Sequence, residues 1–336
     1  MGRLAHVSER AGERTVRLVR TGHKRIHPYA RPDKMASMSH GPQMISLDLP
    51  DGRMLQVIVS GPPDGVPLVW HHGTPGCAWQ LRYRQNEAHA RGLRYVTYTR
   101  AGAAGSTRRP GRSVGDIAED VAAILDHLDA DRCLVGGNSG GGPHALATGA
   151  LLPDRVAAVL CVCGIKPYVG EPDFLDGMGE ANVEEFELAL QGEEALRPFV
   201  MKDRAGIIDS DPEGIIETLA TLLPEVDRGV LRGEAGLDII RGLKGGVVEV
   251  DGWIDDDLAF IQDWGIDPRE LAVPTYVWQG SADLMVPFHH AEWLASNIPG
   301  VVPHLLDGEG HFSVLVGRFG AMVDELLPHL NQKQGA

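Results

Sequence analysis

One short stretch, Gly137-Asn138-Ser139-Gly140-Gly141, constrains the fold of this chain more than any other. It follows an apolar run at 133–135, which predicts a buried strand, and precedes small residues at 143–147, which predict a helix. A serine at the apex of so tight a turn must adopt a strained backbone angle, and side chains at 137 and 141 would collide with the strand and the helix. We therefore interpret Ser139 as a candidate nucleophile, the alternative being a glycine-rich turn that merely joins two elements.

Predicted strands and helices alternate on both sides of this turn. Strand patterns lie at 44–49, 54–60, 66–70, 95–98, 156–162, 274–280 and 301–306, and helical patterns at 77–90, 113–128, 288–298 and 312–330. The alternation predicts an α/β fold with a mostly parallel sheet flanked by helices. Between 166 and 271 helical spacing dominates, which predicts an inserted helical cap, here named the cap segment. We divide the chain into a basic extension (1–43), a core domain (44–165 and 272–336) and the cap segment (166–271).

Charge narrows the classes of partner. The 336 residues carry a formal net charge of −15, which argues against nucleic acid or an anionic membrane as a partner. No apolar run approaches the roughly 18 residues that span a bilayer. The cap segment holds 26 acidic and 9 basic residues. The excess of acidic residues forms either solvated helix faces or a rim that favours amine-bearing substrates. The extension holds nine basic and three acidic residues and lacks the layout of a secretory signal. It is either an upstream extension of the reading frame or an arm on a neighbouring subunit, which leaves a homo-oligomer open.

The four cysteines, Cys77, Cys133, Cys161 and Cys163, are interpreted as small core residues. Cys161 and Cys163 are expected on one face of a strand, where a metal or redox role would need further ligands. The pairs at 71–72 and 289–290 lack the helical spacing of a zinc site. We expect no metal and no cofactor, and with no disulfide framework we expect a cytoplasmic protein.

Two segments near the end of the sequence place an aspartate and a histidine directly after predicted strands, as Ser139 is placed. Asp283 lies just past a predicted strand in the context Gly-Ser-Ala-Asp-x-x-Val-Pro, and His311 lies between Gly310 and Phe312 after the last strand. With Gly-x-Ser-x-Gly, the chain from about residue 44 onward resembles an α/β-hydrolase-fold serine hydrolase, whose triad has the same chain order. The resemblance implies that Ser139, Asp283 and His311 form a catalytic triad.

The chemistry of a triad explains why all three residue types are needed. A serine hydroxyl is a poor nucleophile at neutral pH, so His311 would accept its proton and return it to the leaving group. Asp283 would fix the imidazole tautomer. Asp307 and Glu309 are alternatives nearer to His311 in sequence, but the loop after the strand brings Asp283 to the serine's end of the sheet.

The turn His72-Gly73-Thr74-Pro75-Gly76 follows the strand at 66–70 and predicts an oxyanion hole. One donor is expected from the amide of Gly140, the residue after the nucleophile, and the resemblance points to Thr74 for the other. We expect His72 and Gly73 to support this loop.

The reaction is expected to be hydrolysis of a carboxylic ester or lactone of a small molecule through an acyl-enzyme. The His-Gly-Thr-Pro-Gly loop also resembles that of proline-iminopeptidase-like members, which keeps an aminopeptidase or amidase open, although Gly140 replaces their aromatic residue. The Gly-Asn-Ser sequence also resembles the serine turn of hydrolases that cleave carbon-carbon bonds. Their anionic substrates would need a basic residue in the pocket, for which Arg100 is one candidate. A non-catalytic ligand receptor on the same fold is a further alternative. Four large apolar side chains are expected either to line the pocket or to pack: Met178, Phe186, Trp253 and Trp264.

Overall fold

A computed structural model describes residues 41–168 and 172–331 of the chain. The predicted basic extension lies outside these ranges, except for residues 41–43. Within them, no helix is long and apolar enough to cross a bilayer.

Eight strands form one sheet in the order β1-β2-β4-β3-β5-β6-β7-β8. The first three in this order pair antiparallel and the others parallel, which confirms the predicted mostly parallel sheet. The strands are β1 (Gln43–Asp48), β2 (Met54–Ser60), β3 (Pro67–His71), β4 (Arg94–Tyr98), β5 (Cys133–Asn138), β6 (Val156–Val162), β7 (Thr275–Gly280) and β8 (Val302–Leu306).

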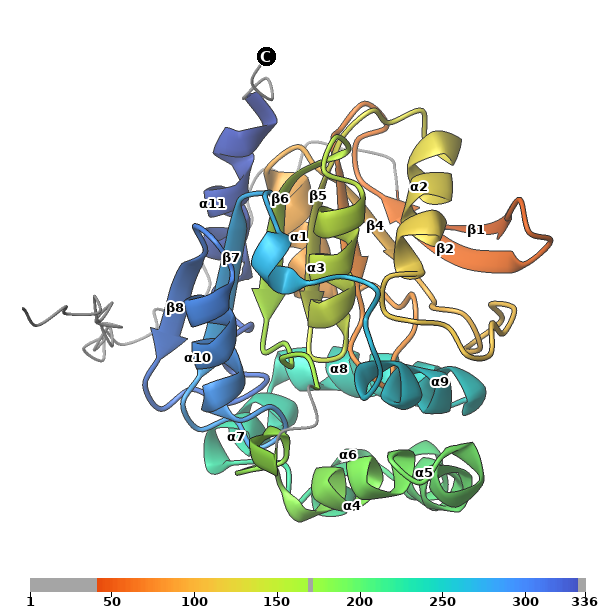
Figure 1. Ribbon diagram of the computed structural model, residues 1–336, viewed down its shortest axis with the longest axis vertical. Coiled ribbons are helices and arrows are strands. Elements are labelled where there is room, and N and C mark those ends of the chain that lie inside the picture. The colour runs from red at the N-terminus through yellow and green to blue at the C-terminus, as the bar shows by residue number, and fades with distance from the viewer. Residues whose placement is uncertain (1–40, 169–171, 332–336) are drawn as a thin grey trace, which may run out of the picture.

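Helices cover both faces of the sheet (Figure 1). One face carries α2 (Ile117–His127), α3 (Gly141–Leu151) and α10 (Phe288–Asn297), and the other carries α1 (Arg82–Ala90) and α11 (Phe319–Leu326). Successive strand residues point to opposite faces, so Val69 and Val135 join one buried cluster while Leu68 and Leu134 join the other. The two clusters pack the helices against both faces of the sheet.

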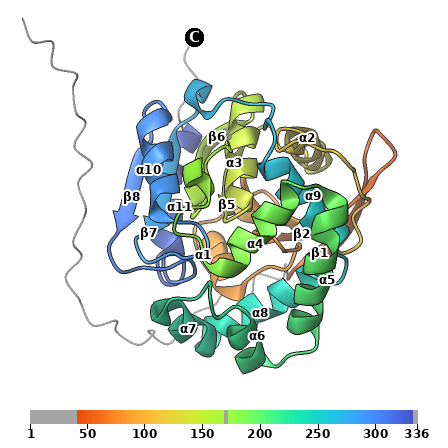
Figure 2. The same ribbon diagram turned by 60° about the horizontal axis from the view of Figure 1, so that its bottom comes forward.

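The cap segment contains six α-helices, and the structure describes no strand in it. They are α4 (Glu180–Ala189), α5 (Glu193–Ile208), α6 (Pro212–Thr218), α7 (Glu225–Arg232), α8 (Glu234–Gly246) and α9 (Asp251–Phe260). Short 3-10 helices flank them, η1 (Pro172–Phe174) before and η2 (Pro268–Glu270) after, and η3 (Leu327–Asn331) follows α11. Figures 1 and 2 show α4–α9 lying across the carboxyl ends of the parallel strands. The division of the chain into domains stays a prediction.

Three predicted helices begin later than expected. The helix at 113–128 begins at Ile117, because Ser113 and Asp116 form a capping turn before it. The helix at 77–90 begins only at Arg82, because Ala78 is held at the end of β4: its carbonyl accepts from Thr97 of that strand, and its amide donates to Thr99 just after it. The closing helix begins at Phe319 and not at 312, because Gly317 adopts a left-handed φ of 84° that interrupts any helix before it.

The expectation that Cys161 and Cys163 share a face is wrong. β6 ends at Val162, and Cys163 has a φ of 49°, which turns its thiol away from the side that Cys161 occupies. Cys161 packs in the cluster beneath α3, whereas Cys163 packs in the cluster on the other face, where its thiol contacts the carbonyl of His311.

Candidate active site

Ser139 occupies the turn between β5 and α3 and has a left-handed φ of 54°. Its amide donates to the carbonyl of Val162 at 2.9 Å, which fixes the turn to the end of β6. A Cβ at Gly137 would overlap the carbonyl oxygen of Gly141, and one at Gly141 would overlap that of His71. The two glycines therefore let strand and helix approach closely enough to hold a strained serine at the apex.

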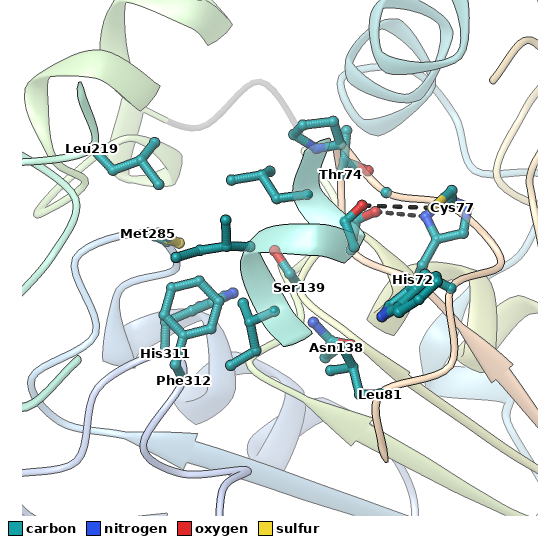
Figure 3. Close-up of a pocket in the computed structure, with 18 of the residues that line it drawn as sticks. His72, Thr74, Cys77, Leu81, Asn138, Ser139, Leu219, Met285, His311 and Phe312 are labelled. Carbon is teal, nitrogen blue, oxygen red and sulfur yellow. Dashed lines mark hydrogen bonds between the residues drawn. The ribbon is translucent and has the colours of Figure 1, made fainter. Parts of the chain in front are cut away.

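Ser139 and His311 line the same cavity, of about 190 Å³, between the sheet and the cap segment. Figure 3 shows His311 beside Ser139, with a ring nitrogen on the side of the serine. No hydrogen bond joins the two side chains in the described structure. They therefore line one cavity without a hydrogen bond between them.

Asp283 lies behind the imidazole. The Nδ1 of His311 donates to Oδ2 of Asp283 at 2.8 Å, and both side chains are almost fully buried. Burial alone would lower the pKa of His311, but the charge and hydrogen bond of Asp283 outweigh it, so the pKa is raised. With Nδ1 bonded to Asp283, Nε2 is the nitrogen left for chemistry in the cavity.

The alternative acids have other partners. Asp307 accepts from the hydroxyl of Ser281, and Glu309 forms an ion pair with Arg318. Among these carboxylates, the structure places only Asp283 against the imidazole of His311, within the residues it describes.

The predicted oxyanion loop packs against the serine turn. A Cβ at Gly140 would overlap the hydroxyl of Thr74, so these two residues are direct neighbours. Neither of their amides donates to another group in the described ranges. These two amides, on adjacent backbone segments next to Ser139, are the predicted oxyanion donors, and that role stays a prediction.

His72 supports this loop from within. Its Nε2 accepts the amide of Arg100 at 3.2 Å, so its Nδ1 donates to the carbonyl of Gly73 at 2.7 Å. Burial and the neighbouring charge of Arg100 lower the pKa of His72 to about 3, which keeps the ring neutral. His72 thus joins the loop, at Gly73, to the backbone that follows β4, at Arg100.

Arg100, the candidate for binding anionic substrates, does not lie in the cavity wall. It is 1% exposed and bonds Asp256 of α9, the carbonyls of His72 and Gly73, and the hydroxyl of Thr74. Asp256 neutralises the charge of Arg100, so the prediction that Arg100 binds anionic substrates is wrong. The reason is packing that brings α9 against the loop.

Asp256 links the cap segment to the oxyanion loop. It accepts from the Thr74 hydroxyl at 2.6 Å and pairs with Arg100 and Arg112. Burial acts to raise the pKa of Asp256, but the two arginines hold it well below its usual range. Asp256 was not among the predicted site residues; in the sequence it is marked only by the acidic run Asp255-Asp256-Asp257 among apolar residues.

A second carboxylate of the cap segment holds the histidine loop. Asp227 of α7 accepts the amides of His311, Phe312 and Ser313 at 2.7, 3.0 and 2.9 Å. Burial raises the pKa of Asp227 despite these hydrogen bonds. Asp227 was not among the predicted site residues either, because no local pattern marks a helix residue that bonds a loop far along the chain.

The cap side of the cavity is mainly apolar. Its wall includes Ile207, Leu219, Leu222, Leu231, Ile240 and Trp253. Met178, Phe186 and Trp264 pack in the core instead. Glu185 and Asp203 add carboxyl groups to this wall, and burial raises the pKa of Glu185 to about 7, although Asp257 and Trp253 bond it.

Cys163, Asp283 and His311 bring three possible ligand atoms within 4.8 Å of one another. The facing atoms of Asp283 and His311 already bond each other. Burial and the charge of Asp283 raise the pKa of the Cys163 thiol well above its usual range, which opposes formation of the thiolate that binds metals. The trio fits a hydrogen-bonded cluster better than a metal site.

Comparisons with known proteins agree with this architecture. A family model described as alpha/beta hydrolase fold matches residues 66–195. A non-heme chloroperoxidase from Streptomyces lividans is 33% identical over 141 residues, which are 40% of this chain and only 50% of that protein. A proline iminopeptidase from Neisseria meningitidis serogroup B is 25% identical over 295 residues, 81% of this chain and 92% of that protein. The structure of a thermophilic esterase from Thermogutta terrifontis matches with a TM-score of 0.61 at 20% identity, covering 87% of this chain and 100% of the other.

The sheet order, the helices on both of its faces and the serine turn after β5 match the expectation from sequence, and the family model covers β3 to the start of α5. The chain therefore belongs to the α/β-hydrolase fold.

Proposed function

We propose that this protein is a serine hydrolase that cleaves a carboxylic ester or lactone of a small molecule through an acyl-enzyme. The observation that carries the proposal is Ser139, held at a left-handed turn in the wall of a cavity that His311 also lines, with Asp283 bonded behind the imidazole. A strained residue facing a cavity is typical of a functional site.

In the proposed reaction, Nε2 of His311 takes the hydroxyl proton as Oγ of Ser139 attacks the ester carbonyl. The carbonyl oxygen becomes negative and accepts from the amides of Thr74 and Gly140. Collapse breaks the bond to the alcohol, which leaves with the proton from His311. Water then repeats the sequence on the acyl-serine and releases the acid.

An ester or lactone is preferred because its alcohol needs less protonation to leave than an amine does. The apolar lining of the cap side also suits an uncharged acyl or alcohol group. One of the solved structures of similar fold is described as an esterase.

Ester hydrolysis and covalent labelling test the proposal together. Wild-type protein is expected to hydrolyse p-nitrophenyl butyrate and to be labelled by a fluorophosphonate, and Ser139→Ala is expected to lose both, with kcat down about a million-fold. Ser296→Ala, at an exposed serine of α10, is the matched control and should behave as wild type. An inert, folded wild-type protein would instead favour the non-catalytic receptor.

A second candidate, an aminopeptidase of the proline-iminopeptidase kind, is favoured by Glu185 and Asp203 in the cavity wall, where a carboxylate could hold a substrate amine. The relative from Neisseria meningitidis covers most of both chains. Turnover of L-proline p-nitroanilide faster than of p-nitrophenyl butyrate, lost in Glu185→Gln, would place this candidate first. Glu187→Gln, at an exposed position of the same helix, is its control.

A further inference from the structure

An arginine without a carboxylate partner lies in the wall of the cavity that contains Ser139. Arg84 of α1 is 6% exposed and lines this cavity. The other buried arginines that the structure describes, Arg53, Arg100 and Arg112, each pair with an aspartate. Arg84 forms no ion pair within residues 41–168 and 172–331.

Neutral groups hold the guanidinium in place. Its Nε donates to the hydroxyl of Tyr83 at 2.9 Å, and its Nη1 donates to Oδ1 of Asn138 at 3.0 Å. Its central carbon lies 4.6 Å from the centre of the Trp70 ring, within reach of a cation–π interaction. These contacts fix the orientation of the group, but none of them brings a negative charge.

No carboxylate of the described structure accepts from the remaining nitrogen, Nη2 of Arg84; the guanidinium also interacts with the phenol of Tyr95, another neutral group of the cavity wall. A buried cation without a counterion is costly, because burial removes water that nothing negative replaces. An anion that entered the cavity would supply the missing charge.

Asn138 adds a second donor beside the nucleophile. Its Oδ1 accepts from both Nε1 of Trp70, at 3.1 Å, and Nη1 of Arg84. Because both partners are donors, the amide atom that faces them is the oxygen, and Nδ2 points to the opposite side. Asn138 lines the cavity next to Ser139, and its Nδ2 has no acceptor in the described ranges (Figure 3).

We infer that Arg84 and Asn138 form a carboxylate-binding subsite beside Ser139, so that the preferred ester carries a free carboxylate on its acyl or its alcohol part. The inference rests on the proposed function, because it describes the substrate of that reaction. A planar guanidinium suits a planar carboxylate, and charge-assisted hydrogen bonds are the strong ones. The field of Arg84 also reaches the reacting groups, since its charge acts to lower the pKa of His311.

Pairs of esters that differ only in charge test the subsite. The acyl side is tested with p-nitrophenyl hydrogen glutarate against its methyl ester, and the alcohol side with 4-acetoxybenzoate against its methyl ester. Wild type is expected to favour the anionic member of one pair by about 10- to 100-fold in kcat/KM. Arg84→Gln should bring that ratio to about 1, and Arg84→Lys should keep part of the preference. Arg82→Gln, at an exposed arginine of the same helix, should keep all of it.

The ratio separates binding of a carboxylate from a merely structural role. If Arg84 only positions Asn138, its loss lowers both members of a pair equally and leaves the ratio unchanged, which overturns the inference. A wild type that hydrolyses neutral esters without preferring the anionic ones also overturns it, while leaving the proposed function intact.

If wild type hydrolyses no ester, the proposed function fails and titration calorimetry with glutarate decides the subsite by itself. Binding to wild type that weakens at least about 10-fold in Arg84→Gln, with Arg82→Gln unaffected, supports the subsite. Equal binding to all three proteins, or no binding to wild type, overturns it. A thermal unfolding curve confirms that each variant is folded.

Discussion

Replacing Asp283 by asparagine tests the pairing behind the imidazole with almost no change in shape. Oδ1 of Asp283 accepts the amides of Met285 and Val286, both at 2.9 Å, while Oδ2 accepts from His311 and from Nε2 of Gln279. In the variant, the carbonyl oxygen of the asparagine would still accept from the two backbone amides, so its NH₂ group would face Nδ1 of His311. The imidazole would then accept at Nδ1 and carry its proton on Nε2.

That tautomer cannot take a proton from Ser139. We therefore expect kcat to fall by about 10⁴, equivalent to about 5.5 kcal/mol in the barrier. The pH profile should move as well. Burial lowers the pKa of His311 and Asp283 raises it, so removing the carboxylate leaves burial dominant. Activity needs the neutral imidazole, so the acidic limb of the profile should shift to lower pH in the variant.

The assay is kcat/KM for p-nitrophenyl butyrate measured from about pH 4 to pH 9 on wild type and variant. Asp307→Asn is the matched control, because Asp307 bonds Ser281 and not the imidazole. An Asp283→Asn variant with near wild-type kcat, or with its acidic limb unmoved, would refute the reasoning from the hydrogen-bond pattern.

Three further substitutions test the frame around the site. Asp227→Asn should weaken the bonds to the three loop amides, lowering kcat about 10-fold and the free energy of unfolding by about 1–3 kcal/mol; unchanged values of both would contradict this role. Asp256→Asn should lower the free energy of unfolding in urea by about 3–5 kcal/mol, because two buried arginines lose their counterion. Because the pKa of Asp256 is depressed in the folded protein, the stability that it contributes is present above the unfolded pKa of about 3.9 and is lost as the pH falls through the folded pKa. In acid, wild type should therefore lose more stability than the variant, and equal losses would contradict this role of Asp256. Gly140→Ala should push against the Thr74 hydroxyl and lower kcat about 10- to 100-fold with little change in KM, and a fully active variant would show that the loop yields freely.

The sheet and the positions of Ser139, Asp283 and His311 were predictable because each signal is local. Each residue follows a strand, and parallel strands bring their carboxyl ends to one edge. Apolar runs and strand-end motifs therefore place side chains near one another without knowledge of the packing. The catalytic roles of these residues stay predictions until the substitutions are measured.

Contacts that depend on how helices pack were not predictable in this way. Arg100 was expected in the pocket, yet α9 brings Asp256 against it and removes its charge from the cavity. Arg84, on a helix with few apolar residues, gave no sign that it would be buried over Trp70. A sequence pattern reports which face of a helix is apolar, but not which charged residue meets its partner after packing.

The excess of acidic residues in the cap segment is a further case in which the sequence does not predict what a charged residue contacts. Its excess of carboxylates admits a solvated surface or an amine-binding rim, but two of those carboxylates do neither. Asp227 bonds the loop after β8 and Asp256 the loop after β3, so the two loops that carry His311 and Thr74 are held from the cap side. Replacing the cap segment with helices that lack these two acids would leave loop amides without acceptors and buried arginines without a counterion. The cap segment is therefore part of the frame that positions the site, as well as one wall of its cavity.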